Sequence, residues 1–393
     1  MDINSSSLSI NQQPIARKGD LLNNSQVLGT SAPTELIRRN FVAVIIPARN
    51  ESELILSTLD SLTSQTRKPD AIIVVANNCT DHGRTAGLAR AISGVTVYEM
   101  ENNPFLKAGA LNYGLAQAMA NGLMPEYVVT IDADTILAPD FIKNSVHVLA
   151  CQPHVGAVSA VCDGKVKLGK TWFEKTLAAV QRAEYARASF TRVRTNIHTL
   201  SGAGTVIRAE AILDVLSDRQ MLFAETDDNL VEDFEMTLEL KRHGWKCVNN
   251  YYCRAETDLM LSVTDLMKQR YRWVHGTINE LRRRGWKRET RTSIMTMWYA
   301  ILSIPVFHLW PLLFMYHVIA GNPAIQDFWF LTLVMAFQAI SVHRLGWKSM
   351  VVAALLLPDL LFGVLRHAWI VKSLFNAYVP QLVLQRSKPQ YSW

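Results

Sequence analysis

Four short apolar runs, separated by stretches of helical periodicity, set the strongest limit on how this chain folds. The runs are Val42–Ile46, Ala71–Val75, Val95–Tyr98 and Tyr127–Ile131. Because consecutive residues in them are apolar, they are typical of strands that are buried on both faces. Alternation of such strands with helices predicts an α/β domain, in which helices cover both sides of a mostly parallel sheet.

Three segments between these runs are expected to form the covering helices: Glu51–Thr66, Asp81–Ala91 and Leu106–Asn121. The first is predicted to begin at Asn50 as its N-cap, with Glu53 three residues later as the capping-box partner. In sheets of this kind, ligands bind at the carboxyl ends of the strands.

Polar residues stand directly after three of the four runs. Pro47–Glu51 follow the first run, Asn77–Asp81 the second, and Asp132 and Asp134 the fourth. Each group alone is compatible with ordinary turn chemistry. Together they are expected to converge on one crevice.

The two aspartates suggest a metal site. Alternate residues of an extended segment point the same way, so Asp132 and Asp134 can both face the crevice. Two carboxylates there would repel unless a divalent cation lay between them. Mg²⁺ or Mn²⁺ binds through one or two carboxylates plus substrate phosphates, and would act as a Lewis acid on a diphosphate leaving group.

The last hundred residues are strongly apolar. The stretches Ile294–Ala320, Phe328–Val342 and Met350–Pro380 predict a transmembrane region over 294–393, with a buried soluble helical domain as the alternative. The third stretch is either one span or two short elements joined near Pro358. The basic run Leu281–Arg291 precedes the first stretch and favours anionic lipid over nucleic acid as its partner.

Basic residues also bear on the membrane topology. Arg282–Arg291 and His343–Lys348 both predict a cytoplasmic location for the chain that carries them. Lys372, Arg386 and Lys388 predict the same for the C-terminus, which three simple spans would contradict. We therefore expect a re-entrant segment or an even number of crossings.

The remaining segments are less informative. Residues 1–40 are rich in Ser, Asn and Gln and are expected to be a flexible arm. The five cysteines form no CxxC pair, so reduced thiols of a cytosolic domain are expected, most of them buried, and no zinc site.

Six motifs occur in an order that resembles the family 2 glycosyltransferases. The resemblance covers about 41–276 and is to the processive, membrane-embedded branch that includes cellulose, chitin and hyaluronan synthases. The motifs are IIPARNE at Ile45–Glu51, NNCTD at Asn77–Asp81, KAGALN at Lys107–Asn112, DAD at Asp132–Asp134, VED at Val231–Asp233 and QRYRW at Gln269–Trp273.

The resemblance implies a Rossmann-like GT-A domain over 41–260, amphipathic interfacial helices over 261–293, and inverting transfer from a nucleotide-diphosphate sugar, expected to be a UDP-sugar. It implies that Asp134, with Asp132, holds the metal and that Asp233 is the general base. It places Gln269, Arg272 and Trp273 at the acceptor and the diphosphate. The donor-binding residues that it implies are Pro47, Arg49, Glu51, Asn77, Lys107 and Asp132. Asn112 is expected in the donor pocket as well.

Some alternatives stay open. Asp233 begins a predicted helix, Glu232–Arg242, and acids at a helix start also complement the helix dipole. Gly202 and Gly204 are consistent with close backbone approach or with a plain turn.

The motifs favour an enzyme that extends a glycan chain at the cytoplasmic face of a bacterial inner membrane. The alternative is transfer of a single sugar to a polyprenyl phosphate, a lipid or a protein. A secretion channel would need several copies of so small a membrane region, so a homo-oligomer is also considered.

Overall fold

The computed structural model describes residues 37–120, 122–165, 171–192, 196–226, 230–321 and 325–379. The expected flexible arm lies outside these residues up to position 36, and Ile37–Asn40 already belong to the first strand. None of the five cysteines forms a disulfide within the described residues. Cys247 and Cys253 are buried, Cys79 and Cys162 are partly exposed and Cys151 is exposed, so fewer of them are buried than expected.

An eight-stranded sheet forms the centre of the molecule, in the order β3-β2-β1-β4-β7-β6-β8-β5. The four predicted strands are β1–β4, which run parallel to one another. The strands are β1 (Ile37–Ala48), β2 (Ala71–Asn77), β3 (Val95–Met100), β4 (Met124–Thr130), β5 (Ile136–Leu137), β6 (Val155–Gly164), β7 (Thr205–Arg208) and β8 (Lys246–Thr257).

The second half of the sheet corrects the expectation of a mostly parallel arrangement. β7 is antiparallel to both β4 and β6, and β5 is antiparallel to β8. Only β6 and β8 pair in parallel there. The sheet is therefore mixed. β7 begins beside the end of β4 and runs in the opposite direction.

Helices cover both faces of the sheet, as predicted. Val44 and Ile46 pack against α2, α3 and α5, whereas Ile45 faces α4, α7 and α8. The helices are α2 (Ile55–Thr63), α3 (Arg84–Arg90), α5 (Phe141–Cys151), α4 (Leu106–Ala118), α7 (Ala209–Arg219) and α8 (Glu232–Arg242). The alternation of neighbouring strand residues between the two cores explains why the strands are apolar at consecutive positions.

The predicted capping box at Asn50 and Glu53 is wrong. α2 begins at Ile55, and its N-cap, Leu54, makes no side-chain capping bond. Asn50 has a left-handed backbone with φ 58°. Its Oδ1 accepts a hydrogen bond from the Thr80 amide at 2.7 Å, and its Nδ2 donates to Thr80 Oγ1 at 3.0 Å. Asn50 therefore joins the loops after β1 and β2.

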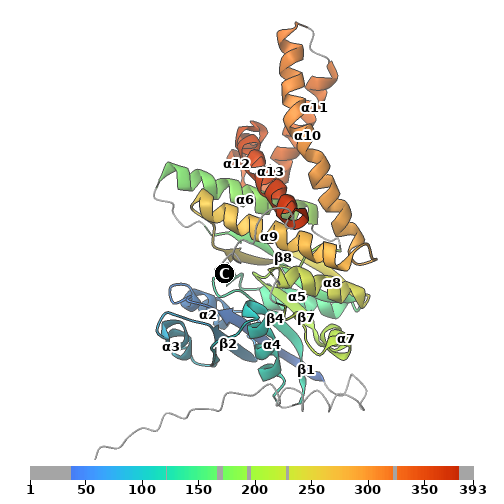
Figure 1. Ribbon diagram of the computed structural model, residues 1–393. Coiled ribbons are helices and arrows are strands. Elements are labelled where there is room, and N and C mark those ends of the chain that lie inside the picture. Colours follow the sequence, from blue (N-terminus) through green and yellow to red (C-terminus); the bar gives the residue numbers. More distant parts are fainter. Residues whose placement is uncertain are drawn as a thin grey trace, which may run out of the picture.

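Three helices form a platform across one end of the sheet: α6 (Trp172–Arg192), α9 (Val263–Arg284) and α13 (Leu357–Tyr378) (Figure 1). α13 packs along α9, so Leu266 is fully buried between these helices. Leu266 and its neighbour Met267 therefore pack against protein, because α13 covers that face of α9.

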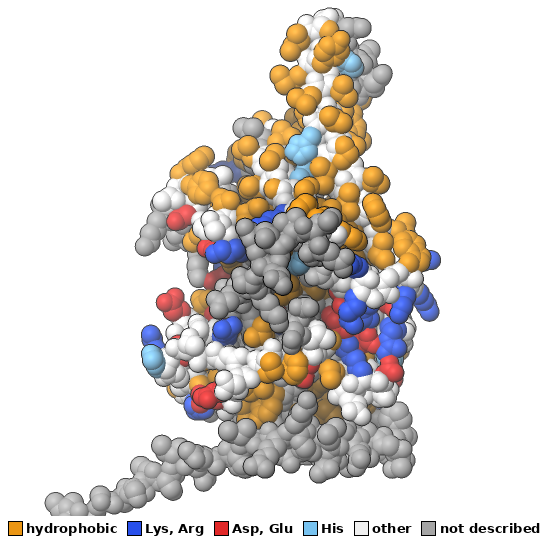
Figure 2. Space-filling model, viewed as in Figure 1, with side chains coloured by type: hydrophobic (Ala, Val, Ile, Leu, Met, Phe, Trp, Pro, Cys, Tyr) orange, Lys and Arg blue, Asp and Glu red, His pale blue; other side chains and the backbone are white. Residues whose placement is uncertain are grey.

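The remaining helices carry the apolar C-terminal region: α10 (Arg291–Ile319), α11 (Ile325–Ser341) and α12 (Trp347–Ala354). α10 and α11 project away from the platform (Figure 1), and hydrophobic side chains cover the projection (Figure 2). Among the described residues, α10 is the one helix long and apolar enough to span a membrane, with a mean hydropathy of 1.5. The third apolar stretch forms two elements, α12 and α13, joined near Pro358.

Candidate active site

A pocket at the carboxyl ends of β1 and β4 brings together four of the predicted site residues: Pro47, Lys107, Asp132 and Asp233. Its other lining residues are Leu111, Thr130, Ile131, Ser201, Gly202, Thr205, Phe223, Glu232 and Met236. The convergence of strand ends predicted from the polar residues therefore holds for β1 and β4.

The acid pair after β4 alternates as expected. Ile131 and Ala133 are buried, whereas Asp132 and Asp134 are partly exposed. Burial, followed by the charge of Asp132, raises the pKa of Asp134 to about 6, although a hydrogen bond from Thr135 opposes the shift. Ionisation of Asp134 is thus costly mainly because the carboxyl group is buried, and a divalent cation, whose preferred ligands are oxygens, would offset that charge.

Lys107, near the start of α4, lies between two carboxylates. Its Nζ is 2.7 Å from Asp132 Oδ1 and 2.6 Å from Glu232 Oε1. Burial lowers the pKa of Lys107, but the charges of Asp132, Glu232 and Asp233 outweigh it and raise the pKa above its ordinary value. The ammonium is therefore charged, and it holds together segments from three parts of the chain.

Asp233 stands in the first turn of α8, whose bounds match the predicted helix. Its Oδ2 accepts a hydrogen bond from the Gly202 amide at 3.2 Å, and its Oδ1 accepts one from the Phe234 amide at 2.7 Å. Burial raises the pKa of Asp233 to about 7; the charge of Glu232 adds to this and that of Lys107 opposes it. A carboxylate with a pKa near neutrality is well matched to proton transfer.

Gly202 explains how the backbone approaches these charges. A Cβ at this position would lie 2.9 Å from Lys107 Nζ and 3.1 Å from Asp132 Oδ2, so a side chain would displace the ion pair. The segment reaches the pocket because β7 is antiparallel to β4, which places the start of β7 beside the end of β4. Of the two alternatives left open by the sequence, the structure favours close backbone approach at Gly202.

Two asparagines assigned to the donor pocket have structural partners instead. The side chain of Asn77 is buried; its Nδ2 donates to Leu106 O at 3.0 Å and its Oδ1 accepts from Asn103 Nδ2 at 2.8 Å. Asn112 binds the backbone of Phe223 through both ends of its amide. Both side chains hold loops beside the pocket, and neither lines it.

Arg49 and Glu51 follow Pro47 in the loop after β1 and are also outside the pocket lining. Their expected contacts with the donor stay predictions.

Two residues of the motif on α9, Gln269 and Arg272, lie on the face that approaches α8. Gln269 and Arg272 share a helix face with Gly276, where a Cβ would lie 2.9 Å from the Val231 side chain. Gln269 Oε1 and Arg272 Nε are buried, and neither has a hydrogen-bond partner among the described residues. The two side chains therefore retain hydrogen-bonding capacity near the start of α8.

Trp273 lies beside a buried arginine. The Arg270 guanidinium is 4.3 Å from the centre of the Trp273 ring, and Arg270 donates to Glu184 Oε2 at 2.7 Å. Arg270 is only 3% exposed. Arg270 therefore points into the protein, where Glu184 of α6 neutralises it.

Ion pairs that sequence reasoning missed connect α9 to α8. Arg284 lies 2.6 Å from Glu235 and 2.9 Å from Glu239, and both acids are almost fully buried. Their positions in the first and second turns of α8 give no signal in the sequence, since acids also occur there to complement the helix dipole.

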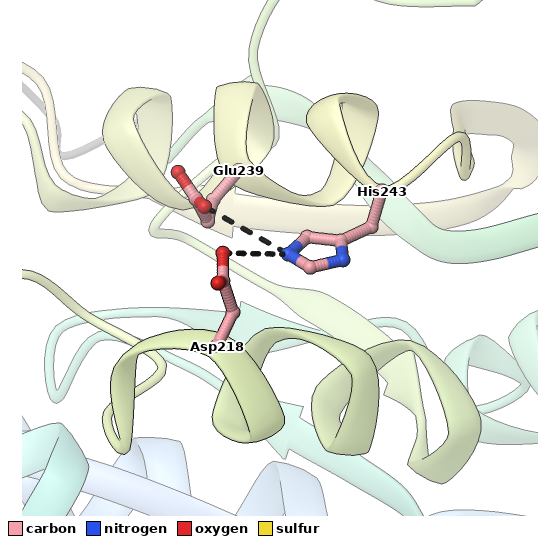
Figure 3. A group of neighbouring side chains, drawn as sticks. All are labelled: Asp218, Glu239 and His243. Carbon is pink, nitrogen blue, oxygen red and sulfur yellow. Dashed lines mark ion pairs between the residues drawn. The ribbon is translucent and has the colours of Figure 1, made fainter.

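A separate cluster, Asp218, Glu239 and His243, has side chains that can ligate metal (Figure 3). His243 Nε2 is 3.7 Å from Asp218 and 3.9 Å from Glu239. The Arg242 guanidinium pairs with both acids, and Arg284 also binds Glu239. The charges of these two carboxylates are already neutralised by arginines. We therefore interpret the cluster as part of the ionic contact between α7 and α8.

Comparisons with known proteins agree with this geometry. Residues 39–276, more than half of the chain, match the family described as "Glycosyltransferase like family 2". Two similar curated proteins are poly-beta-1,6-N-acetyl-D-glucosamine synthases. The one from Staphylococcus aureus (strain COL) is 27% identical over 253 residues, which cover 60% of this chain and 54% of the relative. The one from Staphylococcus epidermidis is 27% identical over 267 residues, covering 62% and 56%. The chain thus spans about half the length of these relatives.

Among solved structures, the chain is similar to a mannosyltransferase from Pyrobaculum calidifontis, in complex with GDP-mannose and Mn²⁺. The TM-score is 0.53 at 20% identity, covering 92% of this chain and 94% of the other. This likeness confirms the expected GT-A fold.

Proposed function

The chain belongs to glycosyltransferase family 2, and on that premise we propose that it transfers a sugar from a nucleotide-diphosphate sugar to an acceptor hydroxyl with inversion at the anomeric carbon. The observation that carries the proposal is the Asp233 carboxylate, whose pKa is raised to about 7 beside the Lys107–Asp132 pair. A proton acceptor and a phosphate-binding cation are thereby held in one pocket.

Asp233 acts as the general base. Its carboxylate takes the proton of the acceptor hydroxyl while the acceptor oxygen forms a bond to the anomeric carbon. On the opposite face of the sugar, the bond from that carbon to the diphosphate oxygen breaks, and its electron pair leaves with the nucleotide diphosphate. The proton then passes from Asp233 to solvent.

Lys107 is the side chain that meets the negative charge of the donor. Its ammonium now neutralises Asp132 and Glu232, and a diphosphate oxygen can replace one of these carboxylates without leaving the cation unpaired. Mg²⁺ or Mn²⁺, held by Asp134 with Asp132, would supply Lewis-acid stabilisation of the leaving diphosphate. The mannosyltransferase from Pyrobaculum calidifontis is in complex with Mn²⁺, which supports this assignment.

The nucleotide is assigned to the loop that carries Pro47, Arg49 and Glu51, with a UDP-sugar as the proposed donor. Asn77 supports the neighbouring loop through Leu106 and contributes indirectly.

We propose chain extension as the outcome of repeated transfer. The named products of the two staphylococcal relatives are polymers of N-acetylglucosamine, which supports this choice. Gln269, Arg272 and Trp273, on α9 beside α8, are assigned to the acceptor and the diphosphate. Transfer of one sugar to a polyprenyl phosphate, a lipid or a protein remains the second candidate, and product length distinguishes the two.

Membrane association is part of the proposal. The apolar surface of α10 and α11 supports an integral membrane enzyme with its catalytic domain on the cytoplasmic face (Figure 2). Membrane lipid and a glycan or lipid-linked acceptor are the proposed partners, and a homo-oligomer is a possible form of the enzyme.

The test is a donor-hydrolysis screen, in which purified full-length protein meets a panel of nucleotide sugars and the released nucleotide diphosphate is measured. We expect one donor to be turned over, activity to stop in excess chelator, and Mg²⁺ or Mn²⁺ to restore it. Asp134→Asn should abolish the metal-dependent turnover and weaken donor binding, whereas Asp60→Asn on the exposed face of α2 should not. Turnover that survives excess chelator would remove the metal from the mechanism, and failure with every donor and metal would overturn the function.

A further inference from the structure

A groove lies between α10 and α13, on the platform and away from the catalytic pocket. It is open to the outside, has a volume of about 500 Å³ and shares no lining residue with that pocket. Its wall consists of Ile304 and His308 from α10, and Val364, His367, Ala368, Val371, Lys372 and Phe375 from α13. The α13 residues recur at helical spacing, so they form one stripe along the helix.

A buried histidine stands in the wall of this groove. His367 is 3% exposed, and its Nδ1 is 3.1 Å from Nε2 of His308. Its Nε2 has no hydrogen-bond partner among the described residues. A buried polar atom without a partner is costly, so this nitrogen is suited to binding a ligand atom.

The pair of histidines is held firmly in place. The Phe307 ring packs edge-on against His367, with centroids 4.7 Å apart. Gly363 lets α10 come this close, because a Cβ there would overlap the Phe307 ring. The unsatisfied nitrogen is therefore a fixed feature of the crossing between α10 and α13.

The charge of the groove is positive. Lys372 lies in its wall, and no acidic residue does. The Lys372 ammonium lies 5.1 Å from the centre of the Tyr271 ring. Within the described residues, Lys372 makes no ion pair. An apolar groove that contains a cation and an unpaired buried nitrogen suits an amphiphile with an anionic head.

We propose that this groove binds an anionic phospholipid. The phosphate contacts Lys372 and His367, and an acyl chain lies along Val364, Val371 and Phe375. When His308 donates to His367 Nδ1, the Nε2–H of His367 donates to a phosphoryl oxygen. Val371 and Phe375 are more than half exposed, so a chain reaches them from the surrounding lipid. The inference rests on the proposed membrane placement and not on glycosyl transfer.

The experiment uses native mass spectrometry of the full-length protein in a non-ionic detergent, with phosphatidylglycerol and phosphatidylcholine added in equal amounts. We expect one phosphatidylglycerol to be retained in preference to phosphatidylcholine. Lys372→Gln should reduce its occupancy about fivefold, the effect of one basic residue on an anionic lipid. Lys348→Gln on α12 is the matched control, because it also removes an exposed lysine beside a tryptophan ring. This substitution should leave the occupancy of phosphatidylglycerol unchanged.

Two further arms decide the outcome. His367→Gln should weaken retention as well, with circular dichroism confirming that the variant is folded. Glycerol phosphate, which has the head-group charge without the chains, should not displace the lipid. Equal retention of the two lipids, equal losses in Lys372→Gln and Lys348→Gln, or displacement by glycerol phosphate would overturn the proposal. A chain that stays soluble without detergent would instead contradict the membrane placement.

Discussion

Four charged side chains lie close together in the catalytic pocket, and their balance governs its chemistry. Lys107 offsets Asp132 and Glu232 directly, and Asp233 is left as the carboxylate whose charge is most costly. Like charges and burial both favour the protonated form of a carboxyl group, which is why its pKa rises. A base of this kind is half ionised near neutral pH, and small changes in its neighbours alter its charge.

Replacing Asp233 with Asn tests this residue. Because only the ionised carboxylate accepts a proton, kcat/KM of the wild type should fall as the pH decreases through about 7. Asp233→Asn should lower kcat by roughly 10²-fold or more, leave donor affinity near normal and remove this pH dependence.

Glu232→Gln is the matched comparison, since it keeps the base and removes a neighbouring like charge. Glu232→Gln should move the acidic limb of the pH profile of kcat/KM to lower pH, because the charge of Glu232 raises the pKa of Asp233.

One result would contradict the role of Asp233 as the base. If Asp233→Asn lost donor affinity but kept its turnover at saturating donor, Asp233 would be a structural cap of α8.

At the scale of elements, α8 and α9 form one unit. Arg284 binds Glu235 and Glu239 of α8, and Gly276 allows α9 to approach the residue before Glu232. These acids are buried, so removing Arg284 takes a charged partner from each of them inside the protein, although Arg219 still binds Glu235 and Arg242 still binds Glu239. The contact therefore fixes the helix that carries Asp233, the proposed base, against the helix that carries Gln269 and Arg272.

Arg284→Gln should accordingly destabilise the protein by about 2 kcal/mol, the scale of a lost hydrogen bond between charged groups, and lower kcat more than donor affinity. Arg283→Gln is the control, because Arg283 is exposed and contacts Glu280 at the surface. The measurements are chemical denaturation for stability and a split of kcat from donor KM. Equal effects of the two substitutions, or a change confined to donor KM, would argue against a positioning role.

Over the whole molecule, α10 and α11 form a projecting hairpin, and both ends of this hairpin lie at the catalytic domain. α10 begins one short turn after α9, and after α11 the Arg344 guanidinium lies 2.8 Å from Asp163 at the end of β6. Val342 packs against Ala186 of α6. The hairpin thus leaves and re-enters on one side, which favours an even number of crossings or a re-entrant segment over three spans.

Cysteine labelling tests the topology. In a variant without the native cysteines, one cysteine is placed at Ala320, near the tip, or at Lys348, after the hairpin. α11 is about 25 Å long, near the lower limit for crossing a hydrocarbon core of about 30 Å. We expect a membrane-impermeant maleimide outside spheroplasts to label position 320 at once and position 348 only after permeabilisation. Equal protection of both sites would identify a re-entrant hairpin.

Sequence reasoning located several elements and part of the site. β1–β4 and α8 lie where the apolar periodicity placed them, and Asp132 and Asp134 alternate with buried neighbours. The capping box at Asn50 failed because its amide binds Thr80, 30 residues away, in preference to the start of α2. Periodicity reports which face of an element is buried, and it does not report which element covers that face.

What the sequence alone determined about this protein is therefore local: the period of its strands and helices, the residue types at the strand ends, and the order of its motifs. The tertiary structure decided the rest. Only folding brings Glu232 to Lys107, places Gly202 beside both and lays α13 over the apolar face of α9. These contacts join residues distant in the chain, and they depend on how the elements are oriented and on the antiparallel entry of β7. Such relative placement is a property of the packed whole and is not encoded in the pattern of any single segment.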